Sequence, residues 1–149
     1  MNPAAAAIAY ADSSALVKLA VAEPESASLR AALSGYAAVV SSELAIVEVT
    51  RAAVRSAGDD GAVRAAMVLD TVDLLRLDRP VLDRAARLPP TELRSLDALH
   101  IASALELRVE VDVVAYDERL LAAARVAGLR TVSPWPELAR PRWLVPQFL

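Results

Sequence analysis

Residues 7–20 read AIAYADSSALVKLA, and this stretch decides the class of fold. Its first five residues are apolar without interruption, which is typical of a strand buried on both faces of a sheet. Asp12, Ser13 and Ser14 then favour the start of a helix, and the apolar residues that follow recur at helical spacing. A buried strand that passes directly into a helix is the repeating unit of an α/β fold.

The same alternation continues along the chain. We expect further strands at 37–40, 72–77, 111–115 and 130–132, and helices at 24–33, 43–56, 61–70, 79–88, 96–106 and 117–127. Strands of this kind, separated by helices, form a parallel sheet covered on both faces. The sequence therefore predicts a single domain over 1–149, with a core at about 8–134: an α/β three-layer sandwich around a central parallel β-sheet, with helices on both faces.

The C-terminal segment 135–149 differs in character, because it combines prolines with Trp135, Trp143 and Phe148. One interpretation is that these aromatic side chains cover a hydrophobic patch of the same molecule. The other is that the segment is an arm that binds a partner.

The composition excludes several classes of protein. The 149 residues include no cysteine, one histidine and only four scattered glycines, so sulfur-based metal sites, thiolate catalysis and glycine-rich phosphate loops are excluded. Residues 1–11 lack a basic residue before the apolar stretch, and Asp12 follows too early for a signal peptide or membrane span. We therefore expect a cytoplasmic protein without a membrane segment.

The net charge of −3 does not decide whether the partner is a nucleic acid. If four carboxylates surround a cation, the rest of the chain is net basic. All basic residues except Lys18 are arginines, whose planar guanidinium suits phosphate.

Four acidic residues stand at unusual positions. Asp12 and Asp117 each follow directly after an expected strand, and the carboxyl ends of parallel strands meet at one edge of a sheet. Asp97 shares a helix stripe with the apolar Ile101, so its carboxylate should point toward the protein body. Glu48 lies inside an expected helix between two valines, where an acid needs a cation or an arginine as partner.

Taken singly, each acid has a structural explanation. Asp12, Asp97 and Asp117 suit helix caps or first turns, and Glu48 suits an ion pair with Arg51. Taken together, carboxylates that converge in one pocket repel one another unless a hard divalent ion neutralises them. Ligands that are all oxygen suit Mg²⁺ or Mn²⁺, and such an ion activates water for phosphodiester cleavage.

Four blocks of sequence carry a resemblance to a known family. They are DSSALVKL at 12–19, the segment 42–51 around Glu48, LDALHIA at 96–102 and VAYDERL at 114–120. In this order they resemble the conserved blocks of PIN-domain ribonucleases, specifically VapC-type toxins, over about 8–134. The resemblance implies the strand order 3-2-1-4-5 and an endoribonuclease that depends on Mg²⁺ or Mn²⁺. It further implies the toxin role in a type II toxin–antitoxin module, with an RNA substrate, a cognate antitoxin whose tail enters the active site, and a homodimer.

The resemblance also implies roles for individual residues. Asp12 and Asp97 would be the principal metal ligands, Glu48 would complete the acidic set, and Asp117 would hold the same ion or a second one, partly through water. Ser14 would hydrogen-bond a ligand carboxylate or a phosphate, with helix capping as the alternative. All four acids are thus candidate catalytic residues.

Other residues near these blocks keep two interpretations. Ala115 departs from the hydroxyl residue that many relatives carry there, which weakens the case for a second ion. His100 is either a general base or, as we favour, a packed histidine with satisfied nitrogens. Lys18 contacts RNA phosphate or is simply solvated, and Arg51 and Arg55 bind the RNA backbone or form solvated ion pairs.

Two other functions compete with the nuclease. Asp12 after a first strand is also the position of the nucleophile in aspartyl-phosphate phosphatases, but Ser14 replaces the usual second Asp and Lys18 is the sole lysine. The third possibility is a catalytically idle PIN-like binding module, which the presence of all four acids disfavours.

Overall fold

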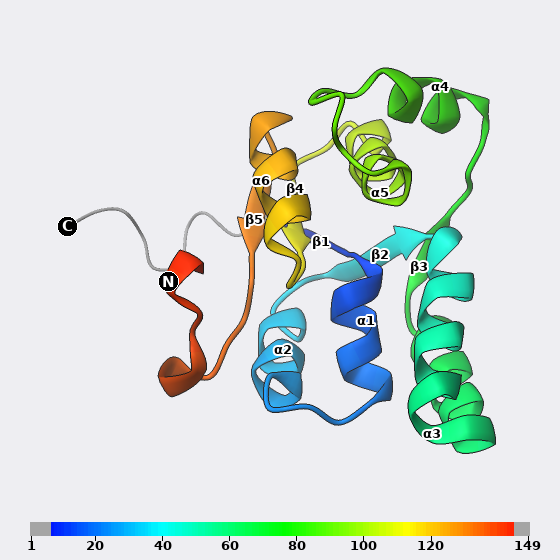
Figure 1. The fold of residues 1–149 in the computed structure, drawn as a ribbon, viewed down its shortest axis with the longest axis vertical. Helices are drawn as coiled ribbons and strands as arrows, with labels where there is room; N and C mark the ends of the chain where they lie inside the picture. Colours follow the sequence, from blue (N-terminus) through cyan, green and yellow to red (C-terminus); the bar gives the residue numbers. More distant parts are fainter. Residues whose placement is uncertain (1–6, 145–149) are drawn as a thin grey trace.

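Five strands form one parallel sheet in a computed structural model that describes residues 7–144. The strands are β1 Ile8–Ala11, β2 Ala38–Ser42, β3 Asp73–Leu75, β4 Val111–Val114 and β5 Arg130–Val132. Their order in the sheet is β3-β2-β1-β4-β5, and every neighbouring pair is parallel (Figure 1). The predicted parallel sheet and its order are confirmed.

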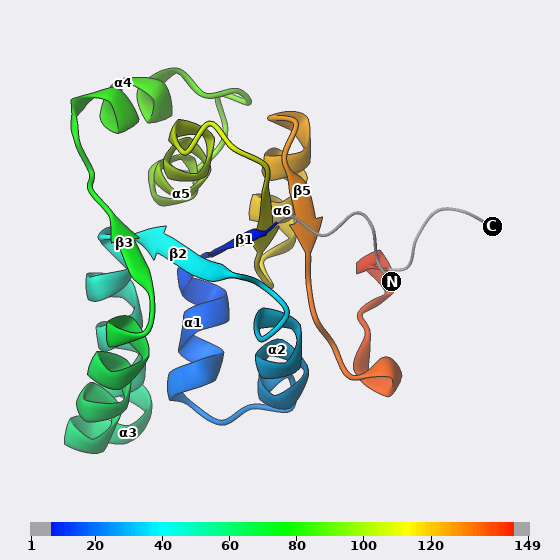
Figure 2. The ribbon, with the colours of Figure 1, turned by 180° about the vertical axis from the view of Figure 1, so that it is seen from behind.

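Helices cover both faces of this sheet. They are α1 Ser13–Ala20, α2 Ser26–Leu33, α3 Leu44–Asp70, α4 Arg79–Arg87, α5 Ser95–Glu106 and α6 Glu118–Val126. Successive residues of β1 point to opposite faces, so Ala9 and Ala11 pack with α1, α2 and α3, whereas Tyr10 packs with α5 and α6. Helix α4 lies outside α5, and the view from behind shows the sheet between the two groups (Figure 2). The three-layer architecture is confirmed.

Helix α3 is a hairpin of two helical segments. Gly58 interrupts it with φ 59° and ψ −137°, a conformation that L side chains rarely adopt. The segment after the turn folds back on the one before it, and a Cβ on Gly61 would lie 2.0 Å from the carbonyl oxygen of Ala53. The two helices expected on either side of the 58–61 turn are thus present. Other differences are small: β3 is shorter than 72–77, and α2 begins two residues after Pro24.

The described part of the C-terminal segment packs on the domain itself. The ring of Trp135 lies edge-on to Tyr116 at 5.4 Å between centroids, and the Tyr116 hydroxyl donates to the Pro134 carbonyl at 2.6 Å. Trp143 packs against the core that α5 and α6 share with the sheet. These contacts agree with the interpretation of an intramolecular cover, while Phe148 lies outside the described residues.

The close approach at Gly61 predicts a stability defect. We expect Gly61→Ala to lower the free energy of unfolding by about 2–3 kcal/mol, because its methyl group cannot fit against the Ala53 backbone. Urea denaturation measures the change. Gly35→Ala is the matched control, since its Cβ would meet the Ala32 oxygen at an ordinary 3.5 Å. Equal stability of the two variants would contradict the tight hairpin.

Candidate active site

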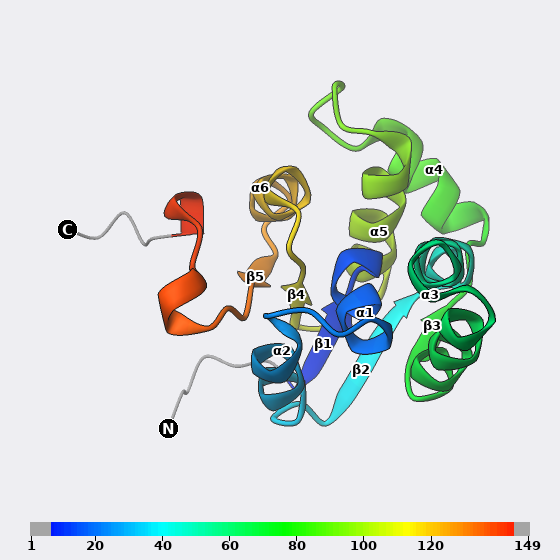
Figure 3. The same cartoon turned by 60° about the horizontal axis from the view of Figure 1, so that its bottom comes forward.

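One cavity at the carboxyl edge of the sheet contains all four acids singled out by the sequence. It has a volume of about 290 Å³. The lining residues are Asp12, Ser13, Ser14, Glu48, Arg94, Ser95, Leu96, Asp97, His100 and Asp117. They come from α1, α3 and α5, which meet near the end of β1 (Figure 3), and from the start of α6. Side chains from four distant stretches of sequence therefore face one small volume.

Asp12 ends β1 and caps α1. Its Oδ1 accepts a hydrogen bond from the Ala15 backbone N–H at 3.0 Å, so the capping interpretation is correct for this residue. The carboxyl group is also almost fully buried. Burial raises its pKa from 3.8 to about 6, and Asp117 adds to the rise, while His100, Ser14 and the Ala15 N–H oppose it. A charged Asp12 is thus costly unless a cation lies beside it.

Ser14 connects Asp12 to the loop after β4. Its hydroxyl lies 2.7 Å from Oδ1 and 2.9 Å from Oδ2 of Asp12, as a donor to that carboxylate. The same oxygen accepts from the Tyr116 backbone N–H at 3.0 Å. Tyr116 directly follows Ala115 and directly precedes Asp117. One hydroxyl therefore fixes Asp12 relative to the loop that carries Asp117.

Glu48 is held by a buried histidine rather than by an arginine. Its Oε1 accepts from the Ser13 hydroxyl at 2.6 Å and from His100 Nε2 at 2.8 Å. Since a carboxylate only accepts, Nε2 carries the proton, and in the neutral ring Nδ1 accepts from the Tyr10 hydroxyl at 2.7 Å. Partial burial would raise the pKa of Glu48, but the hydrogen bonds from His100 and Ser13 outweigh it and leave the pKa below its usual value.

This arrangement corrects one expectation and qualifies another. No ion pair joins Glu48 to Arg51 within residues 7–144, so the expected pairing is wrong. His100 is 3% exposed with both ring nitrogens bonded, as a packed histidine should be, but one of its partners is a candidate catalytic acid.

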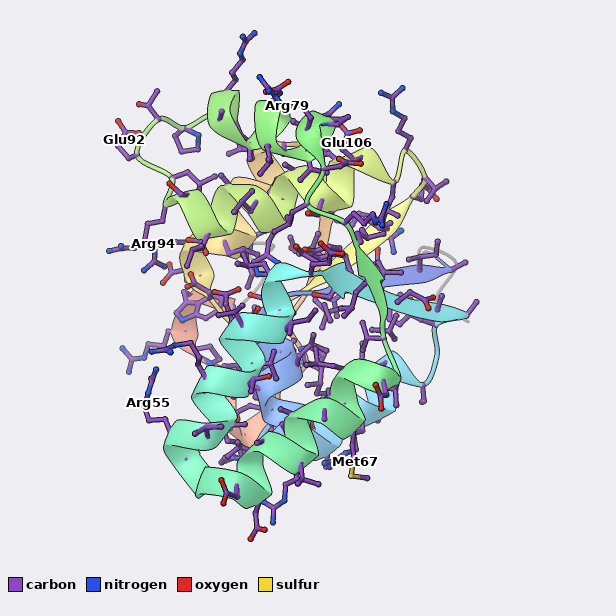
Figure 4. The ribbon with its side chains drawn as sticks, turned by 90° about the vertical axis from the view of Figure 1, so that its right-hand side faces the viewer. Arg55, Met67, Arg79, Glu92, Arg94 and Glu106 are labelled. Atoms are coloured by element: carbon purple, nitrogen blue, oxygen red, sulfur yellow. The ribbon has the colours of Figure 1, made fainter. Side chains whose placement is uncertain are left out.

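Arg94 connects the remaining two acids. Its Nε donates to Asp97 Oδ2 at 3.2 Å and its Nη2 donates to Asp117 Oδ2 at 3.1 Å. Asp117 also caps α6, where its Oδ1 accepts from two backbone N–H groups. Asp97 lies in the first turn of α5 and faces inward as predicted; burial raises its pKa, Arg94 opposes the rise, and Asp117 adds to it. Figure 4 labels Arg94 beside the start of α5.

The donor set fits a hard divalent cation. All four candidate ligands are carboxylates, and burial works against the charge of Asp12 and Asp97 in the absence of a nearby cation. Within residues 7–144, no three His, Asp or Glu side chains already converge on one metal-sized point. The side chains instead satisfy one another through Ser13, Ser14, Arg94 and His100. An ion bound here would therefore have to compete with these present partners of the carboxylates.

Sequence reasoning missed Ser13 and Arg94 as parts of the site. Arg94 stands three residues before Asp97 at the helix start, so its spacing could have indicated an ion pair with that acid. Ser13 looked like a capping residue only. Lys18 is not simply solvated, because its ammonium pairs with Glu23 and Glu25 and lies 4.8 Å from the centre of the Tyr116 ring.

Comparison with known proteins places the chain in a family. A sequence model of the PIN domain matches residues 9–126. The chain belongs to the PIN-domain family. It is 45% identical over 126 residues to Ribonuclease VapC46 of Mycobacterium tuberculosis H37Rv, a match that covers 84% of this chain and 96% of the relative. It is 39% identical over 130 residues to Ribonuclease VapC47 of strain CDC 1551, with the same coverage. The chain is thus a homologue of the mycobacterial VapC ribonucleases, as its sequence blocks indicated.

A solved structure shares this PIN fold. A toxin–antitoxin complex from Klebsiella pneumoniae aligns with a TM-score of 0.66 at 21% identity, covering 85% of this chain and 98% of that one. At this identity the likeness supports the fold. None of the helices in residues 7–144 has the length and apolar character needed to cross a membrane.

The buried charge of Asp12 predicts how stability depends on pH. Because the folded state raises this pKa, it holds the proton more tightly than the unfolded chain, and stability falls as pH rises from about 4 to about 6. We expect Asp12→Asn, which retains an acceptor for the Ala15 N–H, to remove that loss. With chelator present, it should be more stable than the parent by about 1–3 kcal/mol at pH 7.5, with no such gain below about pH 4.

Thermal and urea unfolding across this pH range measure the difference. Asp60→Asn, at an exposed position of α3 close to Gly58, is the matched control and should show no pH-dependent gain. A variant at Asp12 that is less stable than the parent at pH 7.5 would contradict the assigned cost of burying this carboxylate.

Proposed function

We propose that this PIN-domain protein is an Mg²⁺- or Mn²⁺-dependent endoribonuclease and the toxin of a type II toxin–antitoxin pair. The observation that carries the proposal is the gathering of Asp12, Glu48, Asp97 and Asp117 in one cavity. The homology to two VapC ribonucleases across nearly their whole length supports the reaction class. The Klebsiella neighbour, described as a toxin–antitoxin complex, supports an antitoxin as the partner.

Each acid has a defined part in this mechanism. Asp12 and Asp97 would hold the ion, Glu48 would complete the acidic set, and Asp117 would hold the ion directly or through water. Such an ion would supply an activated water and offset charge on the phosphoryl oxygens. Ser14 keeps the Asp12 carboxylate in one orientation, and Ser13 with His100 does the same for Glu48. His100 acts through Glu48 and not as the general base.

RNA reaches the cavity past Arg94, which lies at its rim and suits a phosphate group. Arg51 and Arg55 share a shallow depression with Thr50 and Val54, so they belong to the surface that a homodimer would cover. A phosphatase that forms an aspartyl-phosphate at Asp12 is disfavoured, because Ser14 already binds both Asp12 oxygens and the sole lysine pairs with Glu23 and Glu25.

The site predicts a sharp loss of activity without loss of fold. We expect Asp97→Asn to reduce cleavage of a fluorescent RNA oligonucleotide in Mn²⁺ by about 10²-fold or more, because one ion ligand is removed. The melting temperature in chelator should not fall. Asp60→Asn keeps the same charge change on the surface and should cleave at the parent rate. Parent-like cleavage by the Asp97 variant would refute the mechanism. A parent protein that shows no Mn²⁺ binding dependent on the acids would favour the idle binding module.

An exposed apolar stripe on α3 supports the homodimer as the assembly. Val47 and Val54 are 56% and 44% exposed, lie two turns apart on one helix face, and flank Thr50. Ile46 adds a third exposed apolar side chain beside them. In a two-fold dimer, the stripe of one subunit would pack against the same stripe of the other subunit.

The stripe predicts the position of the dimer contact. We expect Val54→Lys to shift the protein to the mass of a single chain in size-exclusion chromatography with light scattering, because the buried charge lacks a partner. Val63→Lys, at a more exposed position on the other half of α3, should leave the mass unchanged. A parent protein that is already a single chain at high concentration would refute the homodimer.

A further inference from the structure

Arg94 is the one cationic side chain that bonds to two acids of the cavity within residues 7–144. Its Nε and Nη2 atoms reach carboxylates from different elements, Asp97 in the first turn of α5 and Asp117 at the cap of α6. A guanidinium that bridges two carboxylates does the electrostatic work of a bound cation, since it offsets their mutual repulsion.

The bridge is built so that it can open. The Arg94 side chain is 60% exposed, whereas Asp97 is 14% and Asp117 is 33% exposed, so the guanidinium reaches in from the rim. Ion pairs with such an exposed partner are weak. The Arg94 backbone takes the cap position of α5, but its side chain makes no capping bond, so helix formation does not depend on it.

Arg94 bonds to two of the carboxylates that the proposed ion would need. Asp97 is a principal ligand, and Asp117 contacts the ion directly or through water, so the guanidinium and a divalent ion compete for one pair of carboxylates. Two cations this close also repel each other. Metal binding and the Arg94 bridge are therefore alternatives.

We propose that Arg94 is an exchangeable internal counter-cation of the nuclease site, released by the divalent ion and then used to grip the RNA phosphate. This inference rests on the proposed function. Once its Nε and Nη2 donors leave the carboxylates, they remain at the mouth of the same cavity, next to the phosphate to be cleaved. A guanidinium offers that phosphate two parallel hydrogen bonds, so Arg94 becomes a catalytic residue that contacts substrate.

The proposal predicts effects of opposite sign on two measurements. In isothermal titration calorimetry at low ionic strength, Arg94→Gln should bind Mn²⁺ about tenfold more tightly than the parent, because a competing positive charge is gone. At saturating Mn²⁺ the same variant should cleave an RNA oligonucleotide with kcat/KM lower by about tenfold or more, because a phosphate contact is lost. The difference in Mn²⁺ affinity should shrink as salt rises.

Two further variants complete the test. Arg64→Gln, at an exposed position on α3, carries the same charge change away from the site and should alter neither measurement. Arg94→Lys keeps the charge without the planar fork, so its Mn²⁺ affinity should lie closer to the parent while its cleavage stays impaired.

A purely structural role for Arg94 would lower Mn²⁺ affinity, cleavage and melting temperature together, and that result would overturn the proposal. Unchanged or weaker Mn²⁺ binding by Arg94→Gln would do the same, provided that Asp97→Asn abolishes binding. If Asp97→Asn leaves Mn²⁺ binding intact, the metal site itself is wrong, and the role of Arg94 falls with it.

Discussion

Repulsion between carboxylates in a confined, partly dry volume is the constraint on which the rest of this structure depends. Four acids that face one cavity would drive it apart if each stayed charged and unpaired. Hydrogen bonds from Ser13, Ser14 and His100, together with the Arg94 bridge, offset this repulsion. Every candidate catalytic acid therefore has a side-chain partner, which Asp97 and Asp117 share, and those partners also help to orient the carboxylates.

The fold supplies this arrangement from elements that serve the core at the same time. Tyr10 leaves β1 toward the α5 and α6 face, where its hydroxyl bonds to His100, while Asp12, two residues further along, ends the strand at the cavity. The hydrogen bonds from Tyr10 to His100 and from His100 to Glu48 therefore link α5, on one face of the sheet, to α3, on the other. The packing of α3 on α1 brings Glu48 to the same end. Catalytic geometry and core packing share these side chains.

The sequence predicted those features that depend on strand order and strand ends. Parallel strands that alternate with helices leave few possible topologies, and both Asp12 and Asp117 stand where such strands end. Asp97 was placed correctly by its helix stripe. Partners were harder to predict, because Glu48 takes Ser13 and His100 from other elements, whereas sequence spacing favours the neighbouring Arg51. The bridge made by Arg94 depends in the same way on the approach of α6 to the start of α5.

The hydroxyl of Ser14 lies where two parts of the molecule meet: it donates to Asp12 and accepts from the backbone N–H of Tyr116. The loop between β4 and α6 is thus held partly by a side chain of α1, in addition to the bond that the Tyr116 hydroxyl makes to the Pro134 carbonyl. The positions of Asp12 and of the loop that carries Asp117 are consequently linked through one side chain. Change that reshapes this loop during evolution must either retain the serine or find a new anchor for both acids at once.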